Sequence, residues 1–275
     1  MIRIATAFVL SASFASAQTA EQCQASFNHL TGIVVGFFGD GLFSSETLDP
    51  LSEYRDQSRI KGLNGWCRTT VDTDKSGGPG DLVEWRTVPA NFANDKDSLP
   101  ESIDLRVTER GGRDPVIVDL SMSHEPADGL LTVDSFALQI NGDEMLNATA
   151  VLGGAFFDDP RAAQMSLPGL HLDQLVASIE MTSKTRPILY DEISRDELSD
   201  IMDALSIEHL GRTSLNALEG AVLNEPSSNG MLDVSFASSR GLGWMQVAAA
   251  MSRPEEERPA FLLDGAQLSF AWRPN

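Results

Sequence analysis

The stretch LTVDSFALQI, residues 131–140, decides how this chain folds. Apolar and polar side chains alternate along it, which is typical of a strand with one apolar face. Directly after its aspartate the apolar phase slips by one position. A β-bulge has this effect, because it inserts one extra residue and bends the strand. The same pattern returns in LHLDQLVASI, residues 170–179, and in FLLDGAQLSF, residues 261–270. We therefore expect three long, bent strands of one sheet, built from repeated units.

Each repeat carries an aspartate at the slip, namely Asp134, Asp173 and Asp264. An aspartate at such a bend accepts hydrogen bonds from nearby backbone amides. We therefore interpret all three as structural, and a role in binding a ligand stays open as the alternative.

Other segments extend the sheet and add helices. Alternation begins at about residue 82 and marks residues 103–107 and 116–122. After the second repeat the period becomes helical: SRDE at 194–197 is a capping box, and apolar residues follow at helical spacing. We expect this helix to end at Gly211 and a second one to follow, because glycine commonly terminates helices. The pair, residues 194–223, should lie on one face of the sheet.

Residues 1–17 have the form of a secretory signal peptide. Arg3 precedes a short apolar run, and Ala-Ser-Ala at 15–17 is a small-x-small cleavage site. We expect cleavage near Ala17-Gln18 and a mature chain that is periplasmic or secreted. Later apolar runs are shorter than the ~18–20 residues that a spanning helix requires, so we expect no transmembrane segment in the mature chain.

The two cysteines, Cys23 and Cys67, lie near the start of this mature chain. An even number of cysteines in an exported protein indicates a disulfide. Apolar residues at i+4 and i+7 from Cys23 indicate a helix. The expected fold is α+β: a mostly antiparallel, curved β-sheet over 99–275 with the helical pair on one face, and a small helical and loop region over 18–98 closed by the disulfide.

The charge of the chain restricts its partners. It has 20 basic and 40 acidic residues, a net charge of −20. Removing the leader removes only Arg3 among these, so the mature chain carries −21. Long-range repulsion at this charge argues against nucleic acid and against an anionic membrane face. We interpret the acidity as a means of staying in solution, with a calcium ion or a basic partner as alternatives.

One segment resembles a calcium loop. Asp72, Asp74 and Ser76 have the spacing of its first three oxygen ligands. The match then fails, because Pro79 stands where an apolar residue belongs and Glu84 comes one position late. We interpret the segment as a polar turn and keep calcium as a weak candidate.

Catalytic motifs fail in the same way. GDGL at 39–42 is similar to the first block of the Gly-Asp-Ser-Leu esterases but has glycine at the position of the nucleophile. SRIK at 58–61 lacks the companion motifs of penicillin-recognising enzymes. The four histidines are far apart in sequence. We therefore predict no catalytic residue, no resident metal and no cofactor.

The repeated strand with its central aspartate, the paired helices and the acidic, exported context resemble a family of exported Gram-negative envelope proteins with repeated β-units. More distantly, they resemble the AsmA-like proteins. The resemblance covers about residues 100–275 and implies an extended antiparallel sheet whose apolar face holds acyl chains or a partner. The chain departs from the AsmA-like pattern because it has no membrane anchor, and no functional residue carries over.

Together these features favour a non-enzymatic envelope protein that binds a lipid-like ligand or a protein partner on a curved sheet. Two alternatives remain. The protein is then either a structural or interaction module without a ligand, or a hydrolase whose carboxylates meet only in the fold.

Overall fold

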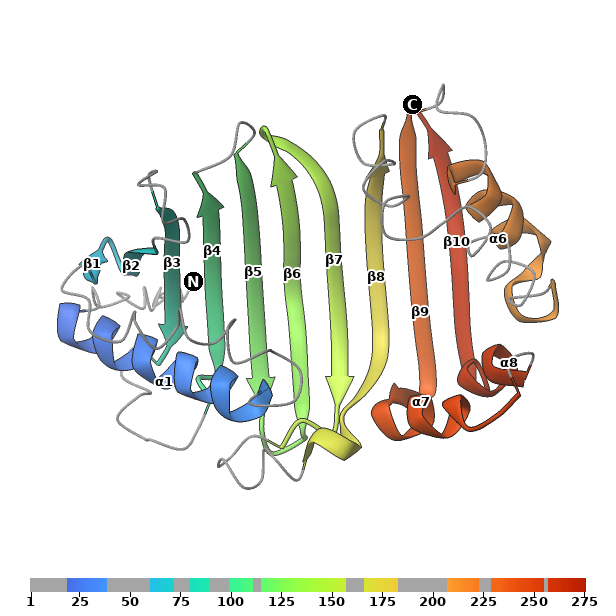
Figure 1. The fold of residues 1–275 in the computed structure, drawn as a ribbon, viewed down its shortest axis with the longest axis horizontal. Helices are drawn as coiled ribbons and strands as arrows, with labels where there is room; N and C mark the ends of the chain where they lie inside the picture. The colour runs from blue at the N-terminus through green and yellow to red at the C-terminus, as the bar shows by residue number, and fades with distance from the viewer. Residues whose placement is uncertain are drawn as a thin grey trace, which may run out of the picture.

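A computed structural model of the chain describes residues 19–38, 60–71, 80–89, 99–110, 115–156, 166–182, 207–222, 229–254 and 257–275. Its main feature is one curved sheet of ten strands, in which every strand is antiparallel to its neighbour and the spatial order is the sequence order (Figure 1). The strands are β1 Lys61–Leu63, β2 Trp66–Val71, β3 Asp81–Val88, β4 Ser102–Glu109, β5 Val116–Glu125, β6 Leu130–Ile140, β7 Asp143–Gly153, β8 His171–Met181, β9 Gly230–Gly243 and β10 Ala266–Pro274. The helices are α1 Ala20–Phe38, η3 Leu167–Gly169, α6 Ile207–Val222, α7 Trp244–Met251 and α8 Arg258–Leu262. The expected α+β fold, dominated by an antiparallel sheet, is confirmed.

Two tight turns of the sheet have a clear local cause. Asn64-Gly65 joins β1 to β2, and Asn141-Gly142 joins β6 to β7. All four residues have positive φ angles, between 53° and 85°. Asn-Gly tolerates the two left-handed positions that a type I′ hairpin turn requires, so each dipeptide reverses the chain at that point.

The first two repeats contain the irregularities that the phase slip suggests. The register between β6 and β7 shifts between Val133 and Phe136, which leaves Asp134 without a partner on β7. In β8 the register shifts at Asp173, which is skipped in the pairing with both β7 and β9. Both aspartates therefore lie at bulges inside long strands.

The third repeat differs, and the expectation of a bent strand there is wrong. Phe261 and Leu262 belong to α8, Asp264 lies in the following turn, and β10 begins only at Ala266. The cause lies outside the repeat: Gln246 of α7 donates hydrogen bonds to the carbonyl oxygens of Phe261 and Leu262. These contacts satisfy acceptors at the end of α8, where a helix lacks internal donors.

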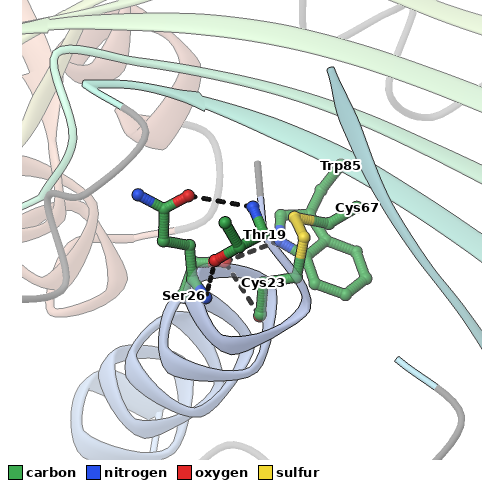
Figure 2. The surroundings of a disulfide bond; sticks show 6 residues. Thr19, Cys23, Ser26, Cys67 and Trp85 are labelled. Atoms are coloured by element: carbon green, nitrogen blue, oxygen red, sulfur yellow. Dashed lines mark hydrogen bonds between the residues drawn. A yellow bond between two sulfur atoms is a disulfide. The ribbon is translucent and has the colours of Figure 1, made fainter. Parts of the chain in front are cut away.

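The N-terminal helix α1 is fastened to the sheet by a disulfide. Cys23 and Cys67 are bonded, with both residues fully buried, which confirms the expected pairing (Figure 2). The helix begins with a capping box, in which Gln22 N–H donates to Thr19 Oγ1 and Thr19 N–H donates to Gln22 Oε1. Its buried Ser26 accepts a hydrogen bond of 2.9 Å from the indole N–H of Trp85 in β3.

The region 18–98 also supplies β1, β2 and β3, although we expected it to be helix and loop before residue 82. Strand β3 pairs with β4 from Leu82–Thr108 to Val88–Ser102. The sheet is therefore continuous across the boundary that the sequence suggested between residues 98 and 99.

Of the expected helical pair, the structure describes the second member. Helix α6 covers residues 207–222, and Gly211 within it has non-helical angles of φ 72° and ψ 152°, so the expected break at this glycine is confirmed. Residues 194–206 of the first expected helix, the leader at 1–17 and the calcium candidate formed by Asp72, Asp74 and Ser76 lie outside the described residues.

Candidate functional site

The pairing register gives the sheet one apolar face, because residues that pair across antiparallel strands project to the same side. One row of such pairs crosses strands β2 to β10 without a polar side chain. It consists of Cys67, Trp85, Leu105, Leu120, Phe136, Ala148, Ala177, Val234 and Phe270. The apolar surface therefore extends over almost the full width of the sheet.

The neighbouring rows are apolar too. We use the term apolar face for the side chains that β4 to β8 contribute to three adjacent rows: Ile103, Leu105, Val107, Val118, Leu120, Met122, Val133, Phe136, Leu138, Leu146, Ala148, Ala150, Leu175, Ala177 and Ile179. Ala177 is buried and the others are half-buried. The side chains of the face are shortest over β7 and β8, where three of them are alanines: Ala148, Ala150 and Ala177.

The bulges keep this face apolar along the whole length of the strands. Val133 and Phe136 both belong to it, although they are three positions apart, because Asp134 and Ser135 have no partners on β7. Since side chains alternate, a strand without the extra residue would turn its second half to the opposite side. The phase slip in the sequence thus preserves one continuous surface.

The opposite side of the sheet is polar and carries a ladder of cross-strand ion pairs. Arg68 pairs with Glu84, Arg86 with Asp104, Arg106 with Asp119, and Arg273 with Asp233. Hydroxyl groups join it: Ser121 donates to Asp104 and Ser178 donates to Asp233. Arg68–Glu84, Arg86–Asp104 and Arg106–Asp119 occupy paired positions on neighbouring strands. Arg273 instead reaches Asp233 diagonally, because the residue paired with Asp233 is Ala271.

Three groups in this ladder have shifted pKa values; one of them is Arg273, whose pKa is raised by its hydrogen bond to Asp233. Hydrogen bonds from Arg273 and then from Ser178 lower the pKa of Asp233 below its ordinary value. A hydrogen bond to Asp119 raises the pKa of Arg106. All three shifts favour the charged forms of these groups.

The helices that flank the apolar face pack on the same side of the sheet. Near β1 to β3, Phe27 of α1 contacts the Trp85 ring at 5.4 Å between centroids, in a cluster that reaches Leu105. At the other end, Leu218 and Ala221 of α6 pack with Leu232, Met181 and neighbouring apolar residues of β8 to β10. In the view of Figure 1, α1 starts beside β1 and runs past the lower ends of β3 to β5, and α6 lies beside β10. The middle strands of the apolar face therefore lie between the two clusters that these helices make with the sheet.

The aspartates predicted from the repeats are not brought together. Asp134 lies on β6 and Asp173 on β8, and β7 separates these two strands. Asp264 lies in the turn that precedes β10 in the sequence, where it pairs with Arg240 at 2.7 Å. Asp173 Oδ1 lies 3.3 Å from Nε2 of His171, whose Nδ1 is 2.7 Å from the carbonyl oxygen of Gly169. The side chain of this histidine is 32% exposed, and the three aspartates do not form a common site.

Other candidate chemistry in the described part of the chain is limited. No group of three or more His, Cys, Asp or Glu residues there has a geometry suited to a metal ion. No described helix is long and apolar enough to cross a bilayer. One pocket of about 230 Å³ lies on the polar side, lined by Leu63, Asn64, Trp66, Arg68, Glu84 and Arg106. Its two arginines are already paired with carboxylates, so the pocket offers no unpaired charge.

No family model, curated protein or solved structure matches this chain.

Sequence reasoning identified most strands of this site but not its extent. Residues 146, 148 and 150 do alternate with polar or exposed positions, yet two of them are alanines and give a weak strand signal. The register that aligns them with Phe136 and Ala177 depends on bulges whose exact positions the sequence does not specify.

Proposed function

We propose that this protein binds a lipid-like ligand outside the cytoplasm, with acyl chains lying on the apolar face between α1 and α6. The observation that carries the proposal is the separation of the two sides of the sheet. Every side chain in the three rows of β4 to β8 is apolar, whereas the ion-pair ladder lies on the other side. Large continuous apolar surfaces of this kind are typical of binding sites.

The chemistry of the face favours acyl chains over an extended peptide. The backbone groups of β4 to β8 are engaged with neighbouring strands on both sides. A peptide laid across the apolar side chains would bury its own N–H and C=O groups without partners, at a cost of about 1–3 kcal/mol for each group. A hydrocarbon chain loses no hydrogen bonds when it leaves water, so its transfer to this surface is favourable.

The dimensions agree with this ligand class. Strands β6, β7 and β8 have 11 residues each. At a rise of about 3.3 Å per residue they span roughly 35 Å. The hydrocarbon of one bilayer leaflet is about 15 Å thick, so an acyl chain fits along a strand. The alanines of β7 and β8 provide the most room for it.

The disulfide supports the proposed location outside the cytoplasm. Cystines form and persist in oxidising compartments such as the periplasm and the exterior of the cell. The Cys23–Cys67 bond is buried and fastens one of the helices that flank the apolar face.

Lipid extraction followed by mass spectrometry tests the proposal. We expect protein purified from its host without detergent to contain phospholipid or fatty acid, and delipidated protein to bind a fluorescent fatty acid with saturation. Protein that carries no lipid and binds neither fatty acid nor an apolar dye would contradict the proposal and favour the structural module.

A further inference from the structure

Helix α7 turns an apolar face to water. Met245 is 63% exposed and Met251 is 64% exposed. Ala248 and Ala249 are exposed as well and share a helix face with Met245, at i+3 and i+4. A surface helix normally exposes polar residues. This helix buries Ala250 but is apolar on its exposed side as well.

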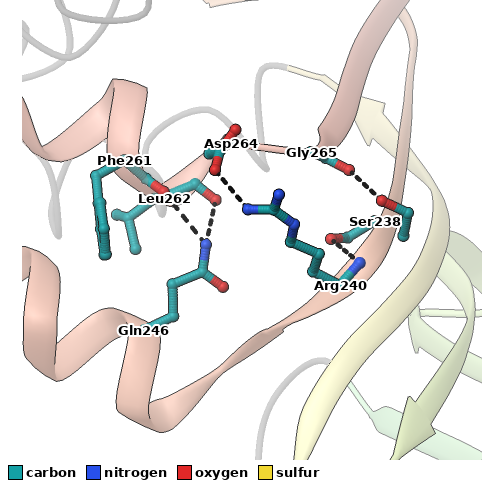
Figure 3. A network of polar contacts seen from close by, with 8 residues as sticks. Ser238, Arg240, Gln246, Phe261, Leu262, Asp264 and Gly265 are labelled. Carbon is teal, nitrogen blue, oxygen red and sulfur yellow. Dashed lines mark hydrogen bonds and ion pairs between the residues drawn. The ribbon is translucent and has the colours of Figure 1, made fainter.

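The inward face of α7 is fixed by polar contacts. Gln246 points towards α8, and its Nε2 donates to the carbonyl oxygens of Phe261 and Leu262, both at 3.2 Å (Figure 3). Rotating the helix to bury the methionines would break both hydrogen bonds and would leave the carbonyl groups without these donors. The outward position of Met245 is therefore built into the fold.

Further exposed apolar side chains lie at the same end of the sheet. This is the end at which β3, β5, β7 and β9 finish. Phe156, 46% exposed, follows β7. Val88 ends β3 at the same end, but it lies on the ion-pair side of the sheet, two positions after Arg86. We call Phe156, Met245 and Met251 the apolar tip; they are three of the six large exposed apolar side chains in the described residues.

Arginines stand beside the apolar tip. The side chain of Arg240, just before α7, is 71% exposed and pairs with Asp264 at 2.7 Å (Figure 3). Arg253, just after α7, is 44% exposed, pairs with Glu257 and lies over the Phe261 ring at 4.1 Å. Exposed ion pairs of this kind contribute little to stability, so each guanidinium group can exchange its carboxylate for a phosphate group. Guanidinium groups bind phosphate through bidentate hydrogen bonds.

The tip is continuous with the proposed binding surface. Leu172 of β8 pairs with Leu242 of β9, and α7 begins two residues later. A ligand that leaves the apolar face along β8 and β9 therefore reaches the tip directly.

From these features we infer that the apolar tip docks on the surface of a zwitterionic phospholipid bilayer, where the acyl ligand passes between the membrane and the apolar face. The methionines enter the headgroup–acyl boundary, as the apolar side of an interfacial helix does, and the arginines contact lipid phosphate. A bilayer without net charge is required, because the net charge of −20 opposes an anionic surface. The transfer of an acyl ligand rests on the proposed function, whereas docking of the tip on the bilayer is tested separately.

Vesicle flotation provides the test. Delipidated full-length protein is mixed with phosphatidylcholine vesicles, and the floating fraction is compared for wild type and for Met245→Gln/Met251→Gln. Because burial of one methionine in hydrocarbon changes a partition coefficient by about tenfold or more, we expect the double variant to bind at least about tenfold more weakly. Val176→Thr is the matched control, since Val176 is 55% exposed on the polar side, away from the tip.

The variants also separate docking from ligand binding. We expect Met245→Gln/Met251→Gln to take up fatty acid from aqueous solution as wild type does, but to acquire it more slowly from vesicles. Wild type that does not float, a double variant that floats as well as wild type, or a Val176→Thr variant that fails equally would overturn the inference. A further result would also overturn it: a wild-type protein that is dimeric in solution and a double variant that is monomeric. A second copy of the chain would then be the partner of the tip.

Discussion

Replacing Ala148 with leucine tests whether the apolar face receives a ligand. Ala148 lies near the middle of β7, paired with Phe136 on one side and with Ala177 on the other. The substitution enlarges a side chain in the part of the face where the side chains are shortest, and it adds no polar atom. It keeps the strand intact, since leucine suits a pleated, half-buried surface at least as well as alanine.

The expected loss of affinity follows from the volume that leucine occupies. It takes the room of about three CH₂ groups of an acyl chain, each worth about 0.8 kcal/mol when buried. Displacing them weakens binding by about 2.4 kcal/mol, which corresponds to a roughly 50-fold higher Kd. Stability should change by less than about 0.5 kcal/mol, because the added atoms meet solvent and not a packed core.

Fluorescence titration with a fatty acid gives the affinity, and urea denaturation gives the free energy of unfolding. Thr149→Leu is the control. Thr149 is the next residue in β7, is exposed, and pairs with Val176 on the polar side of the sheet. We expect this variant to bind the fatty acid with the Kd of wild type.

Two outcomes would refute the reasoning. If Thr149→Leu weakens binding as much as Ala148→Leu does, the ligand does not lie on the apolar face. If Ala148→Leu instead lowers the free energy of unfolding by about 1–3 kcal/mol, the face is already packed by the protein itself, since overfilling a closed core costs that amount.

Three further predictions concern the framework that holds this face. Ser26→Ala should lower the free energy of unfolding by about 1–3 kcal/mol in urea denaturation, because it leaves the buried indole N–H of Trp85 without its acceptor. Asp233→Asn should be less stable than wild type at pH 7. The pKa of Asp233 is lowered in the folded state from its ordinary 3.8, so the carboxylate stabilises the fold above that pH and loses its effect as the pH falls through the lowered pKa. The difference in Tm between the two proteins should therefore disappear in strong acid, and a constant difference would contradict the assignment. Gly241→Ala should lower the Tm more than Gly142→Ala: both glycines have positive φ, but only at Gly241 would a Cβ lie 2.0 Å from a histidine ring atom.

The sequence predicted those strands whose face is readable from local alternation. Residues 103–107, 116–122 and the first two repeats lie in β4, β5, β6 and β8. The third repeat has the same order of apolar and polar residues but begins as helix, because Gln246 holds the two carbonyl groups in α8. Such a contact from a distant residue leaves no signal within the repeat itself.

Strands β1 and β2 escaped prediction for a different reason. The residues of β1 are exposed and the segment has no alternation. Its strand conformation depends on pairing with β2, and β2 is in turn held by β3 and by the bond from Cys67 to α1. Tertiary context of this kind overrides local propensity.

The apolar tip was equally hidden from sequence reasoning. WMQVAAAM, residues 244–251, is apolar at every position except Gln246, so the pattern does not distinguish an exposed side from a buried one. Only the inward contacts of Gln246 show that the methionines must face outward.

The two bulges link the sequence pattern to the shape of the proposed binding surface. They lie on β6 and β8, on either side of the alanine-bearing strand β7. Because a bulge bends its strand and increases the local twist, the sheet is bent where its side chains are shortest. The bends and the short side chains therefore occur at the same place in the sheet. Deleting Ser135 would therefore do more than straighten β6: the extra residue keeps Val133 and Phe136 on one side, so its loss would turn one half of the strand's apolar side chains towards the ion-pair ladder. The phase slip thus matters for the proposed binding, because the bulge both bends β6 and keeps the apolar face free of polar groups.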